Sequence, residues 1–396
     1  MAGIVRGDAD DARLLTRAFL LLGVADLAYF TAIGVAIHGL PLYVTGPIGS
    51  DEAGAGLAFG AFGVTALLCR PFAGRLSDNL GRRPLMIFGA VLCALGMVLL
   101  PFAGSLPLVV GLRLMQGVAE AAFFVAGFAL LADLAPPSRM GEALSYNSLG
   151  LYLGIALGPP LGEVLINWSG FEAAWYGATA LSLLAALLVL GIAEPARHSD
   201  GDGHGRLIHR PGIGVSLGFF ASLAAISGFL AFASLHSEEV GMSNTSLALA
   251  TYGLVIVFCR IAFARVPDRF PSLPLGAASL AAIALGLGLV AAWQSPAGLM
   301  TGVAVMAVGV AFSTPAFFAA IFATARPSER GAASGTASAF IDLGLGFGPI
   351  ALGLVAESRG IPWAFGAGAG IALLGGLWTW RLARLAGQAG RSPAPV

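Results

Sequence analysis

Long apolar stretches alternate with short polar breaks along all 396 residues of the chain. A helix needs about 20 mostly apolar residues to cross the hydrocarbon core of a bilayer. The pattern predicts twelve such helices, near 17–40, 54–74, 85–104, 106–132, 142–167, 172–194, 212–236, 245–266, 273–294, 296–322, 332–356 and 361–381. The fold class that follows is an all-α membrane protein with the bilayer as its partner.

The composition supports a membrane protein and excludes several functional classes. Hydrophobic residues make up 57% of the chain and charged residues 11%, whereas soluble domains carry roughly 25% charged residues. Cys69, Cys93 and Cys259 lie inside apolar stretches and lack metal-ligand spacing. No nucleophile and base set, metal cluster or phosphate loop is present in the sequence. We therefore expect no catalysis, no metal, no cofactor and no nucleic-acid partner. A membrane enzyme, lipid-handling or sensory protein of the same fold is the alternative from another class.

The arginines orient the predicted helices. Of the 21 arginines in the chain, all except Arg113 and Arg359 fall on one side of the spans. Cytoplasmic loops collect Lys and Arg, so the arginine-rich side, which we take to include Arg70 and Arg260, is predicted to be cytoplasmic. An even number of spans then places both termini there. The acidic first 16 residues differ from the basic start of a cleaved signal peptide, so we expect the first span to stay attached.

The two halves of the chain repeat each other. A polar segment at 195–211 separates the predicted six-helix units 1–194 and 212–396. At one constant offset of 190 residues, identical residues coincide: Cys69-Arg70 with Cys259-Arg260, Arg75 with Arg265, Asp78 with Asp268, Pro137-Ser138 with Pro327-Ser328, Gly141 with Gly331, and Gly158-Pro159 with Gly348-Pro349. Ordered matches without a gap indicate an internal duplication.

The segment between the second and third predicted helices carries a long motif. It reads GRLSDNLGRRP from Gly74 to Pro84 and resembles the loop signature GxLaDrxGrkxxl of the major facilitator superfamily. The resemblance implies two parallel six-helix repeats with substrate bound between them. It also implies a cytoplasmic gate, in which the Asp caps a neighbouring helix and pairs with arginine, formed by Gly74, Asp78, Gly81, Arg82 and Arg83. The alternative is a solvated basic turn. The second copy, at 265–270, lacks the glycines and is expected to latch more weakly.

Two further patterns resemble drug:proton antiporters of this superfamily. The fourth predicted helix holds Arg113, Gln116, Gly117 and Glu120, similar to the RxxQG pattern of that group. An arginine at the bilayer centre costs about 2.5 kcal/mol or more, so it is expected to face a partner or a cavity. The fifth helix is similar to the signature gxxxGPxxGG, with Glu163 where the last glycine often stands. Small residues at this spacing also let helices approach closely. The stripe comprises Gly150, Gly154, Gly158, Pro159 and Gly162.

Acidic residues inside the spans are candidate proton carriers. They are Asp26, Glu120, Glu163 and Asp342, and the third, sixth, ninth and twelfth helices hold none in their cores. In the resembled fold those four helices face lipid. Asp26 lies roughly 13 Å into its helix at 1.5 Å per residue, and Glu120 and Asp342 lie at comparable depth. We predict proton coupling through Asp26, Glu120, Asp342 and Arg113. The alternative roles are partnering Arg113 or capping a helix. Glu163 lies nearer the outer end and is a weaker candidate.

Aromatic and amide side chains on the cavity helices are candidate substrate contacts. Tyr29 is preferred because it lies one turn from Asp26, although packing is the alternative role for the whole set. The set comprises Tyr29, Phe30, Gln116, Phe123, Phe124 and Tyr152.

The resemblance, together with these candidates, predicts a secondary transporter. We expect proton-driven efflux of small amphipathic molecules by rocking of two halves, with the proton gradient in place of a cofactor. Gly39-Leu40-Pro41, Arg70-Pro71 and Asp342-Leu343-Gly344 are similar to arabinose-efflux-like permeases of bacteria. A monomer in the bacterial inner membrane is expected. Two alternatives stay open, namely proton-linked uptake of a sugar or organic acid, and an anionic substrate with Arg113 as its counter-ion.

Overall fold

The computed structural model describes residues 14–136, 139–194, 209–326 and 329–389. Its described residues are almost entirely helical, and ten helices among them are long and apolar enough to cross a membrane. The termini, the paired Pro-Ser positions 137–138 and 327–328, and most of the predicted connector 195–211 lie outside the described residues.

Five helices form the first half of the chain. They are α1 (Arg17–Thr45), α2 (Glu52–Leu80), α3 (Arg82–Leu99), α4 (Leu106–Leu134) and α5 (Met140–Leu190), with a 3-10 turn at Leu100–Phe102. Non-helical backbone at Ser169 and Gly170 divides α5 into two legs. Gly170 has φ +79°, a conformation that glycine adopts without a steric penalty. The two legs correspond to the separate spans predicted at 142–167 and 172–194.

The second half has one span that is shorter than predicted. Its helices are α6 (Ile213–Glu239), α7 (Leu247–Ala262), α8 (Val266–Arg269), α9 (Ser272–Ala292), α10 (Pro296–Phe322), α11 (Arg330–Arg359) and α12 (Ile361–Ala389), after a 3-10 turn at Arg210–Gly212. Only 16 residues form α7, because the chain turns into the short α8, which holds the second copy of the loop motif. With α7 and the two legs of α5, the ten apolar helices account for the twelve predicted spans.

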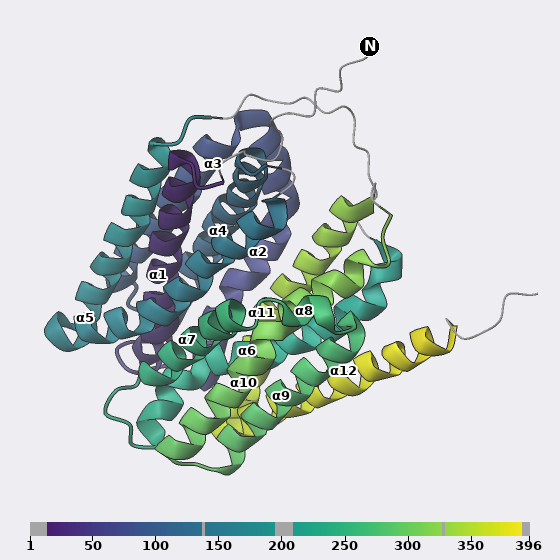
Figure 1. Ribbon diagram of the computed structural model, residues 1–396. Coiled ribbons are helices and arrows are strands. Elements are labelled where there is room, and N and C mark those ends of the chain that lie inside the picture. Colours follow the sequence, from purple (N-terminus) through teal and green to yellow (C-terminus); the bar gives the residue numbers. More distant parts are fainter. Residues whose placement is uncertain (1–13, 137–138, 195–208, 327–328, 390–396) are drawn as a thin grey trace, which may run out of the picture.

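Each half is a bundle, and the bundles lie side by side (Figure 1). In the first, α1 packs along α5 while α4 packs on α2 and α3; in the second, α9 packs on α10 and α12, and α6 on α11 and α12. We call the side where α5 ends and α6 begins the linker side. The opposite side, with the α1–α2 and α6–α7 connections, is the far side.

The two bundles meet through α2 against α11 and through α5 against α7. Glycines allow the α2–α11 approach: a Cβ on Gly60 would lie 2.2 Å from the Gly346 carbonyl oxygen, and one on Gly56 would lie 2.3 Å from that of Pro349. These positions belong to the far-side portion of both helices. In the same way, Gly253 of α7 lies against Ala156 of α5. The halves are therefore in close backbone contact toward the far side.

Candidate functional site

An ion pair inside the helices joins the two halves. Arg70 of α2 donates through Nη2 to Oδ1 of Asp342 on α11 at 2.8 Å, and its Nε faces the second carboxylate oxygen. The Asp342 side chain is 4% exposed and that of Arg70 16%. The Arg70 guanidinium also lies 4.6 Å from the centre of the Phe124 ring. One charge-assisted hydrogen bond and a second close contact between opposite charges hold the guanidinium against the carboxylate, so this pair links α2 to α11.

The two repeated arginines lie within helices, toward the linker-side ends of those helices. Arg70 lies ten residues before the end of α2, about 15 Å along a helix that rises 1.5 Å per residue. Arg260 lies in the last turn of α7. Asp342 has Arg70 as its structural partner, where the sequence pointed to Arg113.

The internal repeat has a counterpart of this ion pair. The 190-residue offset carries Arg70 to Arg260 and Tyr152 to Asp342. In the structure Arg260 of α7 donates to the hydroxyl of Tyr152 on α5 at 3.2 Å, and its guanidinium carbon lies 4.4 Å from the Tyr152 ring centre. A second bond runs to Ser148 at 3.3 Å. The two arginine contacts between the halves thus occupy equivalent positions in the repeat. Arg70 faces a carboxylate and Arg260 faces a phenol.

Two acids lie in the interior of the first half. Asp26 is 4% exposed and Glu120 8%. Asp26 of α1 interacts with the side chain of Asn147 on α5. The Tyr29 hydroxyl lies near Glu120 of α4, yet neither that hydroxyl nor Oε2 of Glu120 has a hydrogen-bond partner in the described part of the chain. The described contacts of both acids include no arginine ion pair.

Arg113 is held within the first half. It is 3% exposed, donates to Gln116 Oε1 at 2.5 Å and to the Ala58 carbonyl at 3.2 Å, and lies over the Phe62 ring. No ion pair joins it to Glu120 in the described chain, although both residues lie on one helix seven positions apart. Gln116 is fully buried and occupied by this contact. Arg113 therefore binds α4 to α2.

The structure separates the six candidate substrate contacts into two groups. Tyr29 and Phe123 stack in the interior, with ring centres 3.9 Å apart, and are 0% and 1% exposed. These two rings pack against each other, and Gln116 is likewise buried inside the first half. Phe124 and Tyr152 instead each lie against an arginine at an inter-half contact. Phe30 meets Phe124 edge to face at 6.4 Å.

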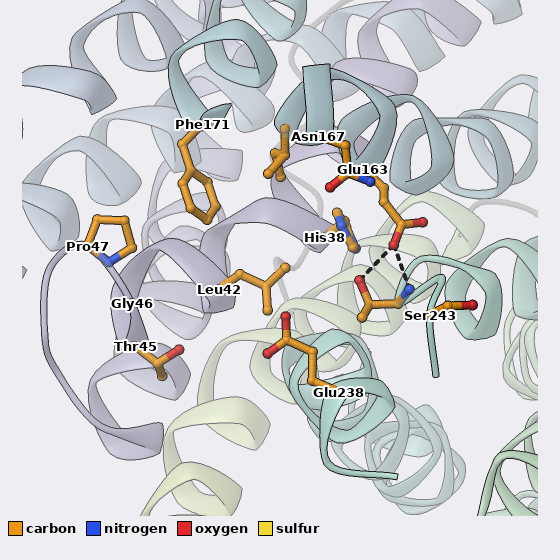
Figure 2. Close-up of a pocket in the computed structure, with 12 residues that line it drawn as sticks. His38, Leu42, Thr45, Gly46, Pro47, Glu163, Asn167, Phe171, Glu238 and Ser243 are labelled. Atoms are coloured by element: carbon orange, nitrogen blue, oxygen red, sulfur yellow. Dashed lines mark hydrogen bonds between the residues drawn. The ribbon is translucent and has the colours of Figure 1, made fainter. Parts of the chain in front are cut away.

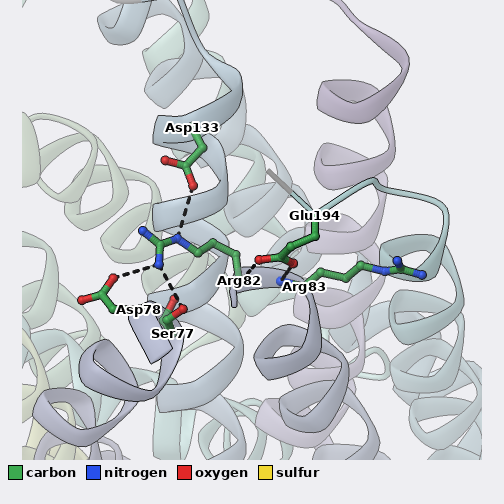
Figure 3. A network of polar contacts seen from close by, with 6 residues as sticks. All are labelled: Ser77, Asp78, Arg82, Arg83, Asp133 and Glu194. Atoms are coloured by element: carbon green, nitrogen blue, oxygen red, sulfur yellow. Dashed lines mark hydrogen bonds and ion pairs between the residues drawn. The ribbon is translucent and has the colours of Figure 1, made fainter. Parts of the chain in front are cut away.

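The loop motif forms a polar network on the linker side (Figure 3). Arg82 contacts Asp78 at 2.8 Å, Asp133 of α4 at 3.2 Å and the Ser77 carbonyl at 3.0 Å. All described partners belong to the first half. The side chain of Asp78 is 72% exposed. A Cβ on Gly74 would meet no atom of the described chain within 4 Å, so no described contact there requires glycine.

The helix cap at this network comes from Glu194 and not from Asp78. The Glu194 carboxylate accepts the backbone N–H groups of Arg82 and Arg83 at 2.7 and 2.8 Å, at the first residues of α3. Acidic groups are favourable at helix N-termini. Gly81, with φ +107°, leaves room for it, since a Cβ there would lie 2.5 Å from a Glu194 oxygen. The expected cap by Asp78 is therefore not found among the described contacts, and the sequence reading missed Glu194.

A pocket of about 390 Å³ opens on the far side between the halves (Figure 2). It is lined by His38, Leu42, Glu163, Asn167 and Glu238, among others. His38 of α1 is 1% exposed and bonds Ser234 of α6 at 2.9 Å.

Glu163 caps a helix of the other half at this pocket. From α5 it accepts the Thr245 N–H at 2.6 Å, the Thr245 hydroxyl at 3.1 Å and the Ser246 hydroxyl at 2.6 Å, directly before α7 begins. From the sequence Glu163 was a weak candidate proton carrier, with helix capping as an alternative role, and this contact corresponds to that alternative. Its contact ties the halves together on the far side.

Glu163→Ala is expected to weaken far-side closure. Losing a helix cap costs about 1 kcal/mol, which shifts a two-state equilibrium roughly fivefold. Spin labels at Phe102 and Trp363, exposed positions on the far side of opposite halves, would report a larger long-distance population by double electron–electron resonance. Glu238→Ala removes a carboxylate from the same pocket without a described bond to α7 and should leave the distances unchanged. If Glu163→Ala and the parent protein had the same distribution of spin-label distances, this role of Glu163 would be contradicted.

Comparison with known proteins gives relatives along nearly the whole chain. The chain is 31% identical over 375 residues to the MFS-type transporter STM4428 of Salmonella typhimurium, covering 88% of this chain and 92% of that protein. It is 29% identical to YhhS, an MFS-type transporter of Escherichia coli K12, with 90% of each covered.

Solved structures share the fold at low identity. The D-xylose-proton symporter aligns with TM-score 0.76 at 18% identity over 92% of this chain and 97% of that one. The human organic anion transporter MFSD10 aligns with TM-score 0.71 at 19% identity over 92% and 99%. Their different cargoes show that the fold alone does not select a substrate. The Major Facilitator Superfamily model matches residues 20–298 and 215–395. The predicted fold of two six-helix repeats is thereby confirmed, and the chain belongs to the Major Facilitator Superfamily of secondary transporters.

Proposed function

We propose that this transporter exports small amphipathic molecules in exchange for protons. The observation that carries the proposal is the pair of acids Asp26 and Glu120, buried in the first half without an arginine ion pair. Burying an ionised carboxylate costs far more than burying the neutral acid. Each acid therefore favours one protonation state when shielded and another when it reaches water, as proton coupling requires.

The inter-half contacts support alternating access. The far side is closed by glycine contacts and by the hydrogen bonds of Glu163 of α5 to Thr245, just before α7. The Arg70 pair with Asp342 adds a link deeper between the halves. In the proposed cycle the halves rock about this region and expose the site to one side at a time. The proposed orientation places the linker side, with the arginine-rich loops, in the cytoplasm.

Asp26→Asn and Glu120→Gln are each expected to uncouple transport from the proton gradient. Both substitutions keep the shape of the side chain and remove its exchangeable charge. Proteoliposomes loaded with pyranine would be screened with a panel of amphipathic compounds for compound-dependent proton movement. For a compound moved by the parent protein, we expect gradient-driven flux to fall at least tenfold in each variant, while exchange of labelled against unlabelled compound persists.

Glu172→Gln is the matched control, because Glu172 is an exposed acid of α5 and should not alter coupling. The sign of the flux under an inward proton gradient separates export from proton-linked uptake. Unchanged gradient-driven flux in both acid variants would overturn proton coupling through these residues.

A further inference from the structure

We infer that Arg260 of α7, with Tyr152 of α5, binds the carboxylate of an organic monoanionic substrate. This names the substrate class of the exporter proposed above and rests on that proposal. The carboxylate of the substrate would pair with Arg260 in the way that the carboxylate of Asp342 pairs with Arg70.

The first support is the difference between two equivalent positions. Duplication placed an arginine at 70 and again at 260, each facing the opposite half. Arg70 is neutralised by two-point contact with Asp342. The position equivalent to Asp342 holds Tyr152, whose phenol brings no negative charge. The repeat thus retains the cation and lacks the anion at one of its two inter-half contacts.

The second support is the incomplete bonding of Arg260. Its described hydrogen bonds go to the hydroxyls of Tyr152 and Ser148 at 3.2 and 3.3 Å, and no carboxylate of the described chain pairs with it. The Nε atoms of Arg260 and Arg70 are both buried without a hydrogen-bond partner among the described residues, but only that of Arg70 faces a carboxylate. A charge buried between helices normally has a partner of opposite sign, so an arginine contacted only by neutral groups marks a place for an anionic ligand.

Arg113 does not fit the role of substrate counter-ion that the sequence suggested for it. Its guanidinium is 3% exposed and donates to an amide and a backbone carbonyl inside one half. Arg260 is only partly buried and faces the other half. A ligand at Arg260 would touch α7 and α5 together and so sense their relative movement.

The chemistry of the contact favours a carboxylate on an apolar body. A guanidinium presents parallel N–H donors that match the two oxygens of a carboxylate. The Tyr152 hydroxyl can turn to donate to the same group. One arginine balances one negative charge, so a monoanion fits better than a doubly charged phosphate.

Equilibrium binding to the purified full-length transporter tests the inference without a proton gradient. Benzoate, 3-phenylpropanoate and 4-phenylbutyrate would each be compared with the corresponding neutral amide by isothermal titration calorimetry. We expect at least one acid to bind at least tenfold more tightly than its amide. Arg260→Gln should abolish that preference, whereas Arg359→Gln, on the far side over Trp363, should retain it.

Tyr152→Asp gives a sharper test, because it rebuilds the pairing seen between Arg70 and Asp342. The new carboxylate should occupy Arg260 and remove binding of the acid while the arginine stays in place. If that variant does not fold, Arg260→Lys is the substitute. Lysine keeps the positive charge but lacks the parallel N–H donors of a guanidinium, so the acid should bind more weakly but still better than its amide. The inference is overturned if no acid is preferred over its amide or if Arg260→Gln keeps the preference. Loss of proton coupling with intact acid binding would refute the proposed exchange alone.

Discussion

Asp342→Ala is expected to destabilise the protein by about 3–5 kcal/mol, because it leaves the Arg70 guanidinium in the helical interior without its carboxylate. The loss should exceed the value of the ion pair itself, since most of it is the cost of an unpaired buried charge. Arg70→Met/Asp342→Leu removes both charges and leaves apolar side chains. The double variant should recover most of the stability, although the directional link between α2 and α11 is gone.

The measurement is a double-mutant cycle on thermal unfolding of the purified protein in one detergent, with transport assayed on the same samples. Asp78→Ala is the matched control, because it breaks an ion pair of the same helix whose carboxylate is 72% exposed. Exposed pairs contribute at most about 1 kcal/mol. We expect the double variant to be folded and slow in transport. A double variant as unstable as Asp342→Ala would show that the buried charge is not the cause.

Much of the fold could be predicted from the sequence, because lipid imposes a simple rule on every span. Apolar length located the helices, and the 190-residue offset showed that the halves are copies. The break at Ser169 and Gly170 divides α5 between the two spans predicted there. The difference lies at α7, which ends and gives way to α8 sooner than hydropathy suggests. That ending depends on local backbone geometry that apolar length does not record.

The candidate site was predicted less well, because its contacts join residues far apart in the chain. The partner of Arg70 was missed, because counting arginines near helix ends gives no information about a carboxylate 272 positions away. The same offset that revealed the repeat also aligns Tyr152 with Asp342, but a search for identical residues passes over a pair that differs. That pair could have been found by asking what faces each repeated arginine.

Glu194 was missed as a helix cap, and the helix that Glu163 contacts was not predicted, for a related reason. Each caps a helix from a distance of 82 or more positions, and the sequence near each residue carries no cap signal. Asp78 lies three residues before Gly81, which precedes α3, and was therefore the predicted cap. In the structure the cap of α3 comes from Glu194, which lies four residues beyond the end of α5.

Gly158→Leu is expected to prevent formation of the folded protein or to destabilise it by at least about 3 kcal/mol. A Cβ on Gly158 would lie 2.5 Å from the Gly34 Cα and from the Thr31 carbonyl oxygen of α1, so even the first added carbon meets backbone. Overpacking of flexible side chains typically costs 1–3 kcal/mol, and backbone yields less readily. Gly154, where a Cβ would lie 2.6 Å from the backbone of Phe30, should behave alike.

Two other glycines of the same stripe provide controls. A Cβ on Gly150 or Gly162 would have its nearest neighbour at 3.3 Å, so alanine at either position should cost less than about 1 kcal/mol. The measurement is the unfolding temperature and the size-exclusion profile of four single alanine variants, at Gly150, Gly154, Gly158 and Gly162. We expect lower unfolding temperatures at Gly154 and Gly158, where the contact distances are shortest, than at Gly150 and Gly162. A flat series would show that α1 and α5 do not approach as closely as the structure places them. A well-folded Gly162→Ala that fails in transport would instead mean that the stripe serves movement of the halves as well as their assembly.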